Sequence, residues 1–540
     1  MTEIYQPVEE RTAPGPLRNP DEVIDRYVAC FNRHDEELRH GGVPNALAAE
    51  WMKREVPFFE CADSLLERVY WFRWWVFRKH IVNTPDGHII TEFLPDVYWS
   101  GAYNSINCAS GHHIAEARWL RGGKELIREY VNFWFKGPGD ELSYSSWVID
   151  AIVRYAELRD DRELAVGLLD EFVRFYRTVE DRNMTRYGLF WSYDDRDAME
   201  DSISGSGLRP TLNSYMAANA RAIATIARWA GHDTLAFEYD TKADTLTDLI
   251  RTYLWDKDAD FFKVIPLNDK DDALASMDFA DVDPGRNVRE EIGYIPWAFG
   301  LADNAHEKAW SWLNDSDYFA GAVGIRTAEI NHPRYMNRES AHECQWNGPC
   351  WPFATTQTLN SMLAEIRSGR GALSADDFMR ELRRYAAIHT RQRDDGEIVD
   401  WLDEDLDADT GAWISRDQLE AWGWRDDKGG YERGKDYNHS AFADLIISGL
   451  AGLRVDEHAD ATVLVVEPLA AGRSMPYWRL LGVPVRGHSV DVLYDREGDR
   501  YGCGVGLTVR VDGVECHDVG ESRDGVQVVL ARQARKESIR

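Results

Sequence analysis

From Asp21 onward, apolar residues recur three or four positions apart, with short interruptions, as far as Leu453. Because an α-helix has about 3.6 residues per turn, this spacing puts apolar side chains on one face and predicts amphipathic helices. The expected helices cover residues 22–31, 65–81, 110–120, 125–135, 144–158, 163–179, 212–229, 234–254, 305–313, 352–366, 375–389 and 440–450. The pattern therefore predicts a mainly α domain over residues 21–455.

These helices follow one another in one continuous series, and loops rich in polar and aromatic residues separate alternate members. A closed toroid of six helical hairpins would present such a series. A solenoid of stacked repeats is the alternative, but the chain shows no self-similarity with a fixed period of about 30–45 residues. We therefore expect a closed toroid.

After Asp456 the chain changes to short runs rich in β-branched and aromatic residues, separated by Gly, Asp and Pro. Such runs predict strands, placed at residues 461–466, 478–481, 489–493, 506–511 and 525–530. The Asp512-Gly513 turn predicts a hairpin. We expect a small β-rich module over residues 456–540, and an irregular arm over residues 1–20.

The chain has 540 residues, with 62 basic and 93 acidic side chains and a formal charge of −31. A field of this sign repels nucleic acids and anionic membrane surfaces, so we expect neither as a partner. An acidic, solvated surface that aids solubility explains the charge most simply. Without an apolar run of about 18 residues or an apolar region near the amino terminus, the sequence predicts no membrane span and no signal peptide. The oligomeric state stays open.

Seven cysteines are scattered along the chain: Cys30, Cys61, Cys108, Cys344, Cys350, Cys503 and Cys516. An odd number without a Cys-x-x-Cys pair predicts neither a zinc cluster nor a disulfide framework, and reduced thiols fit a cytoplasmic protein. His112, His113 and His439 show no spacing typical of metal ligands. We therefore expect no metal and no cofactor.

Residues 345–352 read Gln-Trp-Asn-Gly-Pro-Cys-Trp-Pro and stand directly before a predicted helix. The indole faces of Trp346 and Trp351 suit the apolar C–H patches of a sugar ring, and the amides of Gln345 and Asn347 suit its hydroxyl groups. The prolines restrict the loop and reduce the entropy lost on binding. A Trp-rich core loop is the alternative interpretation.

A first acidic loop holds Glu200 and Asp201, among Gly and Ser residues that lie between Trp191 and the helix predicted at 212–229. A second acid and a nearby indole raise the pKa of a carboxyl group, and a raised pKa suits a general acid. Acidic and Ser residues before a helix also serve as caps, so a structural role is the alternative.

A second acidic loop, residues 401–413, places Glu404 and several Asp residues between two Trp residues. Counted as an EF-hand from Asp405, its sixth and twelfth positions are Thr410 and Arg416, where a calcium loop requires Gly and Glu. Calcium is therefore not expected. The loop is interpreted either as the source of a catalytic base or as a solvated turn.

A third loop, residues 431–440, is dense in hydrogen-bonding groups and includes Glu432 and His439. It leads into a predicted helix that Ser440 is suited to cap. Its side chains either bind sugar hydroxyls and hold a base in position, or form an internally satisfied polar network.

The helical part resembles the (α/α)6-barrel glycoside hydrolases of family 63, notably the branch that hydrolyses mannosylglycerate and glucosylglycerate, and more distantly the trehalases. Residues 98–104, which include Tyr98, Trp99 and Asn104, look like the early Trp-rich motif of that family. Residues 347–352, Asn-Gly-Pro-Cys-Trp-Pro, look like its R/N-G-P-x-W-P motif, and this is the strongest resemblance. The resemblance implies an (α/α)6 barrel that acts on α-linked glycosides.

The resemblance also implies a general acid in the first loop. The family carries an acidic residue after Gly-Met or Gly-Trp, and Ala-Met-Glu-Asp-Ser at residues 198–202 is the equivalent string, so Glu200 is the expected acid. The family has Asp where this chain has Glu, and another acid follows directly. Asp201 is therefore the alternative acid.

The base of that family is the Glu of an E-x-x-N/E-P-x-T-G motif, which residues 404–411 resemble without the proline. This makes Glu404 the expected base. Residues 416–430 have no counterpart in the family pattern, and the insertion keeps Glu432 as the rival base.

We therefore predict an inverting glycoside hydrolase that acts at a chain end or on a small glycoside. In such an enzyme one carboxyl group protonates the leaving oxygen, while an ionised carboxylate activates water on the opposite face of the ring. Substrate contacts are expected from Tyr98, Trp99, Asn104, Trp191, Arg209, Gln345, Trp346, Asn347, Trp351 and His439. The alternatives are an inverting glycoside phosphorylase, a non-catalytic carbohydrate-binding barrel and, with less support, a polysaccharide lyase.

Overall fold

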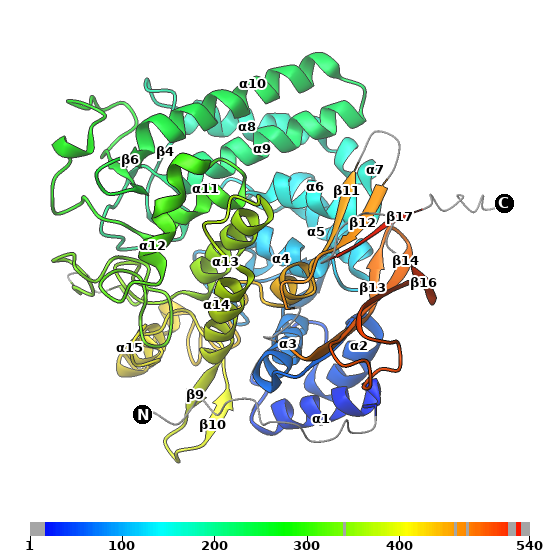
Figure 1. Ribbon diagram of the computed structural model, residues 1–540. Coiled ribbons are helices and arrows are strands. Elements are labelled where there is room, and N and C mark those ends of the chain that lie inside the picture. The colour runs from blue at the N-terminus through cyan, green and yellow to red at the C-terminus, as the bar shows by residue number, and fades with distance from the viewer. Residues whose placement is uncertain (1–16, 339–341, 458–461, 471–474, 517–524, 531–540) are drawn as a thin grey trace.

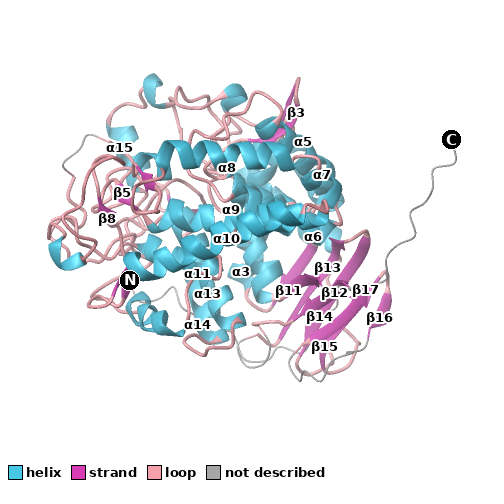
Figure 2. Cartoon of the chain, turned by 90° about the horizontal axis from the view of Figure 1, so that it is seen from above, coloured by secondary structure: helices cyan, strands magenta, loops and turns pink. Residues whose placement is uncertain are grey.

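The computed structural model describes residues 17–338, 342–457, 462–470, 475–516 and 525–530 (Figure 1). Helices dominate the molecule, and the strands of the carboxyl-terminal part gather on one side of the helical body (Figure 2). A mainly α chain followed by a β-rich region is what the hydrophobic pattern predicts, and the structure confirms both. The boundary between them at residues 455 and 456 stays a prediction.

The α-helices are α1 (Pro20–Arg33), α2 (Ala48–Glu55), α3 (Ser64–Phe77), α4 (Ser110–Ala117), α5 (Gly123–Phe135), α6 (Val148–Arg159), α7 (Arg162–Val166), α8 (Leu169–Asn183), α9 (Pro210–Trp229), α10 (Asp233–Leu249), α11 (Ile295–Ala298), α12 (Trp310–Leu313), α13 (Pro352–Arg367), α14 (Ala375–Ala387) and α15 (Ile414–Ala421). Two π-helical segments, η5 (Ile250–Leu254) and η10 (Leu445–Leu450), continue the series. Both α9 and α13 begin with a proline, whose fixed φ and missing N–H suit the first helical position.

Some helices differ from the sequence prediction at their ends. The helix predicted at 65–81 ends at Phe77, because a 3₁₀ turn and strand β2 (Ile81–Thr84) follow it. The helix predicted at 163–179 is broken into α7 and α8, and the one predicted at 440–450 is largely the π-helical η10. Helix α1 begins at Pro20, inside the arm predicted over residues 1–20, of which residues 1–16 lie outside the described residues.

Six helical segments contact one another in series, each with the next: α4, α6, α9, α11, α13 and η10. The series is closed by Glu116 of α4. Its carboxylate accepts hydrogen bonds from the backbone N–H groups of Phe442, Ala443 and Asp444, which lead into η10. The segments between these helices contain the remaining helices from α5 to α15. The contacts therefore form a ring.

Loops that precede the ring helices meet one another at one end of the ring. Ser145, before α6, donates its backbone N–H to the carbonyl of Arg196, before α9, at 2.8 Å. Trp346, before α13, donates its backbone N–H to the carbonyl of Glu200 at 3.0 Å. The three loops that precede α6, α9 and α13 thus lie side by side, and this is the end where the candidate catalytic loops are found.

The carboxyl-terminal strands form two antiparallel sheets. One has the order β1 (Phe58–Cys61), β13 (Tyr477–Val485), β14 (His488–Asp495), β15 (Gly506–Val511) and β16 (Val514–Cys516). The other has the order β11 (Leu453–Glu457), β12 (Thr462–Val466) and β17 (Val526–Leu530). The hairpin predicted at Asp512-Gly513 is confirmed by the pairing of Val511 with Val514. Strand β1 comes from the amino-terminal region, and its four residues were not predicted because so short a run has no visible alternation.

Among the residues that the structure describes, no helix combines the length and the apolar character needed to cross a lipid bilayer.

Candidate active site

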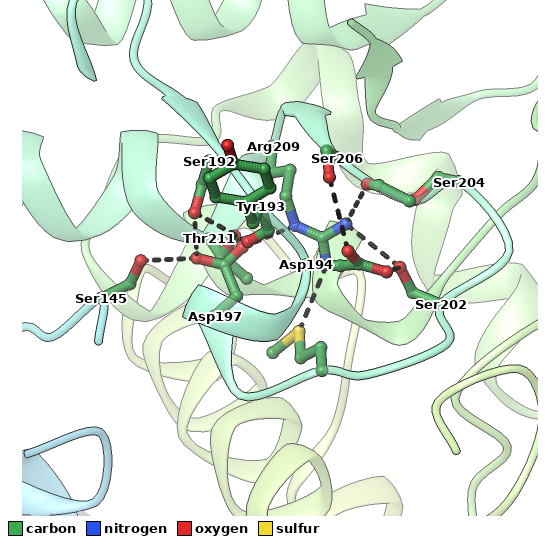
Figure 3. A network of polar contacts seen from close by, with 12 residues as sticks. Ser145, Ser192, Tyr193, Asp194, Asp197, Ser202, Ser204, Ser206, Arg209 and Thr211 are labelled. Atoms are coloured by element: carbon green, nitrogen blue, oxygen red, sulfur yellow. Dashed lines mark hydrogen bonds and ion pairs between the residues drawn. The ribbon is translucent and has the colours of Figure 1, made fainter. Parts of the chain in front are cut away.

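The loop that carries Glu200 is held by a buried ion pair between Arg209 and Asp197 (Figure 3). Arg209 Nε donates to Asp197 Oδ2 at 2.6 Å, and both side chains are fully buried. The guanidinium also donates to the carbonyl of Gly205 at 2.5 Å and to Ser202 Oγ at 3.2 Å. Asp197 accepts a further bond from Ser145 Oγ at 2.6 Å. Arg209 uses its N–H groups to shape this loop, and the substrate contact expected of it from the sequence stays a prediction.

The backbone around Glu200 is strained. Ala198 has φ 57° and Asp201 has φ 58°, a region that residues with a Cβ rarely adopt. Such strain persists only where surrounding contacts impose it, and it is concentrated at functional sites. The two left-handed residues turn the chain on both sides of Glu200.

Glu200 is partly accessible to solvent. The pKa of its carboxyl group is raised to about 8. Burial is the main cause, because it disfavours the charged form, and the negative charges of Asp195, Glu404 and Glu92 add to it. No ion pair holds Glu200 within the described part of the chain. A carboxyl group in this state keeps its proton at neutral pH. Asp201 is also partly exposed and lies near enough to Asp195 to raise the pKa of that residue.

Glu404 is buried and is paired with a cation. Its Oε2 contacts Arg433 Nη2 and accepts a bond from the Cys344 thiol at 3.5 Å. Burial raises the pKa of Glu404 to about 7, whereas the positive charge of Arg433 opposes that rise. Arg433 also donates through Nη1 to Glu343 Oε1 at 2.7 Å. Glu404 is therefore the carboxyl group of this pair whose ionised form is favoured by a neighbouring cation, against the effect of burial.

Glu432 lies in the third acidic loop, in a left-handed conformation with φ 54°. Its Oε1 accepts a bond from Arg416 Nη2 at 2.7 Å, and its Oε2 lies 3.4 Å from Lys435 Nζ. Glu432 is not among the main charges that act on Glu200, whereas Glu404 is. The charge of Glu404 therefore affects the candidate acid more strongly than the charge of Glu432 does.

The Trp-rich segment before α13 is buried. The rings of Trp346 and Trp351 are stacked with centroids 4.4 Å apart and an interplanar angle of 12°. Trp351 Nε1 donates to the carbonyl of Gln345 at 2.7 Å. Within the described residues, Gln345 Oε1, Trp346 Nε1 and Asn347 Oδ1 are buried without a hydrogen-bond partner. Because an unpaired buried polar atom is costly, three in succession indicate polar groups kept for a ligand.

The three residues of the early aromatic motif differ in their exposure and in their contacts. Tyr98 is 75% exposed, and Trp99 is half-buried with the Arg433 guanidinium 5.4 Å from its ring centroid. Asn104 holds its own loop, since Nδ2 donates to the carbonyls of Phe93 and Pro95 and Oδ1 accepts from Val97. Trp99 is thereby connected to the Glu404 pair, and Asn104 acts as a loop anchor.

Trp191 is buried at 6% exposure. Its Nε1 donates to the carbonyl of Leu267 at 2.7 Å, and its ring meets that of Tyr193 edge-on at 4.4 Å. Tyr193 is 52% exposed. Trp191 therefore supports the exposed Tyr193 on the loop that leads to Glu200.

His439 lies at the start of the last ring segment and belongs to a buried polar cluster. Its Nδ1 lies 2.8 Å from the Tyr437 hydroxyl, and its Nε2 lies 3.1 Å from Cys108 Sγ. Cys108 also donates to Glu92 Oε2 at 3.2 Å. Glu92, Cys108 and His439 each offer an atom that can bind a metal ion, and these atoms lie within 4.8 Å of one another.

Sequence reasoning missed Glu92, Cys108, Tyr437 and Arg433 as members of the site. Tyr437 and Arg433 stand in the third acidic loop, so its density of polar groups was a usable signal. Glu92 follows the short strand β3 (Gly87–Ile90) in no recognisable motif, and Cys108 is one of several scattered cysteines. Only the folded chain brings these two beside His439.

A cavity of about 440 Å³ lies apart from the acid pair, between the ring helices. His112, Trp147 and Gln357 line one part of it, and Arg154 and Arg367 line another. Neither Glu200 nor Glu404 borders this cavity.

A family model described as the mannosylglycerate hydrolase MGH1-like glycoside hydrolase domain matches residues 102–440, more than half of the chain. Residues 102–440 therefore form a glycoside hydrolase domain. The chain belongs to the MGH1-like glycoside hydrolase family, which confirms the resemblance seen in the sequence motifs. No curated protein sequence matches the chain.

Solved structures give further likenesses. A protein described as a sialidase is 34% identical with a TM-score of 0.81, and the match covers 92% of this chain and 44% of that one. The chain thus spans less than half of the length of that relative. A GH78 family rhamnosidase of a Bacillus species is 13% identical with a TM-score of 0.50, covering 81% of this chain and 40% of that one. A GH63 mannosylglycerate hydrolase from Thermus thermophilus, in complex with glucose, is 13% identical with a TM-score of 0.46, covering 66% of this chain and 95% of that one.

Proposed function

We propose that the helical part is an (α/α)6 barrel and that its catalytic face is the end where the ring helices begin. Two observations support this arrangement. The contacts from α4 through η10 return to α4 through Glu116, and the loops before α6, α9 and α13 are hydrogen-bonded to one another. In a barrel of this kind the helices supply rigidity, and the loops at one end supply the chemistry.

On this face we assign an inverting hydrolysis of an α-linked glycoside, with Glu200 as general acid and Glu404 as general base. The observation that carries the assignment is the contrast between the two carboxyl groups. Glu200 has no cation partner in the described residues, whereas Glu404 contacts Arg433, whose positive charge opposes the rise of its pKa. A cation beside one carboxyl group favours its ionised form, which suits a base, and its absence beside the other favours the protonated form, which suits an acid.

The reaction follows from those two states. Glu200 donates its proton to the glycosidic oxygen as the bond to the anomeric carbon breaks, and Glu404 takes a proton from the water that attacks the opposite face. An inverting enzyme needs roughly 6.5–9.5 Å between the carboxyl groups to admit that water. The family resemblance supplies the α-linkage and the preference for a chain end or a small glycoside.

Substrate binding is assigned first to the segment before α13. The unpaired polar atoms of Gln345, Trp346 and Asn347 suit sugar hydroxyl groups, which are both donors and acceptors. The exposed Tyr98 and the half-buried Trp99 supply ring surface nearby, because Trp99 lies against the guanidinium that contacts Glu404. Arg209, Asn104 and Trp191 support these loops and are not assigned a direct contact.

The experiment is a panel of α-linked disaccharides and aryl glycosides, assayed with the full chain and with Glu404→Gln. Hydrolysis that is lost in Glu404→Gln and independent of added phosphate supports the proposal. Turnover that requires phosphate and survives Glu404→Gln indicates a phosphorylase instead. Saturable binding without any product indicates a non-catalytic carbohydrate-binding barrel, and a product with an unsaturated ring indicates a lyase.

A further inference from the structure

We propose that Glu92, Cys108 and His439 form a zinc site beside the candidate active site. The three ligand atoms are Glu92 Oε2, Cys108 Sγ and His439 Nε2, all on side chains that are 2–4% exposed. Sγ lies 3.2 Å from Oε2 and 3.1 Å from Nε2, and Nε2 lies 3.7 Å from Oε2. These atoms face one another as a triangle inside the protein.

The size of that triangle suits a zinc ion. Zinc binds thiolate sulfur at about 2.3 Å and imidazole nitrogen or carboxylate oxygen at about 2.0–2.2 Å, in tetrahedral geometry. Those bond lengths place neighbouring ligand atoms about 3.3–3.6 Å apart. The observed S–N, S–O and N–O edges of 3.1, 3.2 and 3.7 Å lie within about 0.5 Å of this spacing, so small side-chain movements would complete the geometry. Thiolate, imidazole and carboxylate together are a donor set that zinc prefers.

Proton accounting gives an independent reason for a cation here. The Tyr437 hydroxyl donates its one hydrogen to Glu92 Oε1 at 2.9 Å, so it accepts the bond from His439 Nδ1 at 2.8 Å. His439 therefore carries its proton on Nδ1 and turns the lone pair of Nε2 toward Cys108 and Glu92. The single S–H hydrogen of Cys108 then faces two acceptors, Nε2 and Oε2. Zinc in place of that hydrogen satisfies all three atoms at once.

Tyr437 completes the arrangement around the site. Ligating histidines in zinc proteins nearly always donate the other ring N–H to an oxygen, which fixes the tautomer and the ring orientation. The Tyr437 hydroxyl accepts this bond from His439 Nδ1, and it donates its own hydrogen to the second oxygen of Glu92. His439 is also held by stacking on Phe353, with centroids 4.4 Å apart and an interplanar angle of 24°. The ligands are thus fixed by neighbours that are not themselves ligands.

The position in the fold indicates what the zinc would do. Glu92 follows β3, Cys108 precedes α4, and His439 precedes η10. One ion would therefore join the first and last segments of the helical ring where the ring closes. Cys108 and His439 are 331 residues apart and Glu92 and Cys108 are 16 apart, so no local spacing reveals the site and the sequence predicted no metal. Three protein ligands leave a fourth position for water or another oxygen.

The test measures zinc rather than catalysis, so its result does not depend on the proposed function. The full chain is purified, incubated with zinc sulfate, freed of unbound metal and analysed by mass spectrometry of the metal. We expect about one zinc per chain, and at least a tenfold lower content in Cys108→Ala and in His439→Ala. Cys344→Ser is the matched control, because Cys344 is another buried thiol that contacts Glu404 and is outside the triangle. It should keep the full zinc content.

A second measurement covers the case in which the variants do not fold. The unmodified chain is loaded with cobalt(II), which occupies zinc sites and gives a near-ultraviolet thiolate-to-metal absorption band when a cysteine is a ligand. The band should appear at about one cobalt per chain and disappear when zinc is added. Substoichiometric zinc in the unmodified chain, or equal zinc in Cys108→Ala and the unmodified chain, overturns the proposal. The cluster would then be held by hydrogen bonds alone.

Discussion

Replacing Arg433 by Met distinguishes between Glu404 and Glu432 as the general base. Arg433 contacts Glu404 Oε2 through Nη2 and Glu343 Oε1 through Nη1, and every member of this group is 1% exposed. Removing one partner of such a buried pair costs about 3–5 kcal/mol, because a buried charge is left uncompensated. The pKa of Glu404, about 7 with Arg433 present, must therefore rise when the opposing charge is removed.

The size of the effect follows from that cost. One pKa unit corresponds to about 1.4 kcal/mol, so a rise of one unit or more uses only part of the lost pair energy. At pH 7 the ionised fraction of Glu404 then falls from about one half to about one tenth or less. A base acts only when ionised, and its activity is lost as the pH falls through its pKa. The acidic limb of the kcat/KM profile should therefore move to higher pH by at least about one unit.

The assay is the pH dependence of kcat/KM on an α-linked glycoside, with folding checked by circular dichroism. Arg433→Lys keeps the positive charge and should leave the acidic limb close to that of the unmodified enzyme. Arg416→Met is the matched control, because Arg416 pairs with Glu432, the rival base. An acidic limb that moves in Arg416→Met and stays fixed in Arg433→Met would refute the reasoning and identify Glu432 as the base.

Three further predictions follow from other contacts. Glu200→Gln should lower kcat/KM about 10²–10⁴-fold on natural glycosides. The loss should be much smaller on aryl glycosides with good leaving groups, because these leaving groups need no protonation. Equal losses on both substrates would contradict the role of Glu200 as acid. Asp197→Asn should lower the free energy of unfolding by about 3–5 kcal/mol, measured by denaturant titration, because it removes the charged partner of the buried guanidinium of Arg209. Burial opposes the ionisation of Asp35, but Lys79 and Lys435 outweigh it and hold its pKa well below the usual range. This contribution to stability is present above about pH 4 and is lost as the pH falls further, so Asp35→Asn should flatten the acid side of the stability profile, and an unchanged slope would contradict it.

Helices could be predicted where the sequence signal lies within the helix itself. Helices α9 and α13 combine three-four spacing with a proline at the first helical position, and both appear at nearly the predicted bounds. The π-helical form of η10 has no comparable signal in the sequence. Helix α2 was missed because its eight residues give too few turns to establish a period.

The candidate site also contains some features that the sequence predicts and others that it does not. The motifs pointed to the loops of Glu200 and Glu404, since acids and Trp residues are adjacent there in the chain. The pairing of Glu404 with Arg433 spans 29 residues and depends on the path of the loop between them. Arg209 and Asn104 donate hydrogen bonds to the backbone of their own loops, and these contacts are not visible in the sequence. The residue type shows which hydrogen bonds and charges a side chain can offer. Only the fold shows which partner it contacts.

The most direct test of the central claim is the anomeric form of the first product, followed by proton NMR during hydrolysis of an α-linked glycoside. A proton-donating Glu200 and a water-activating Glu404 on opposite sides of the sugar require inversion, so the β-anomer should appear first and then mutarotate. If the α-anomer appears first, the configuration is retained and the assignment of this acid and base is wrong.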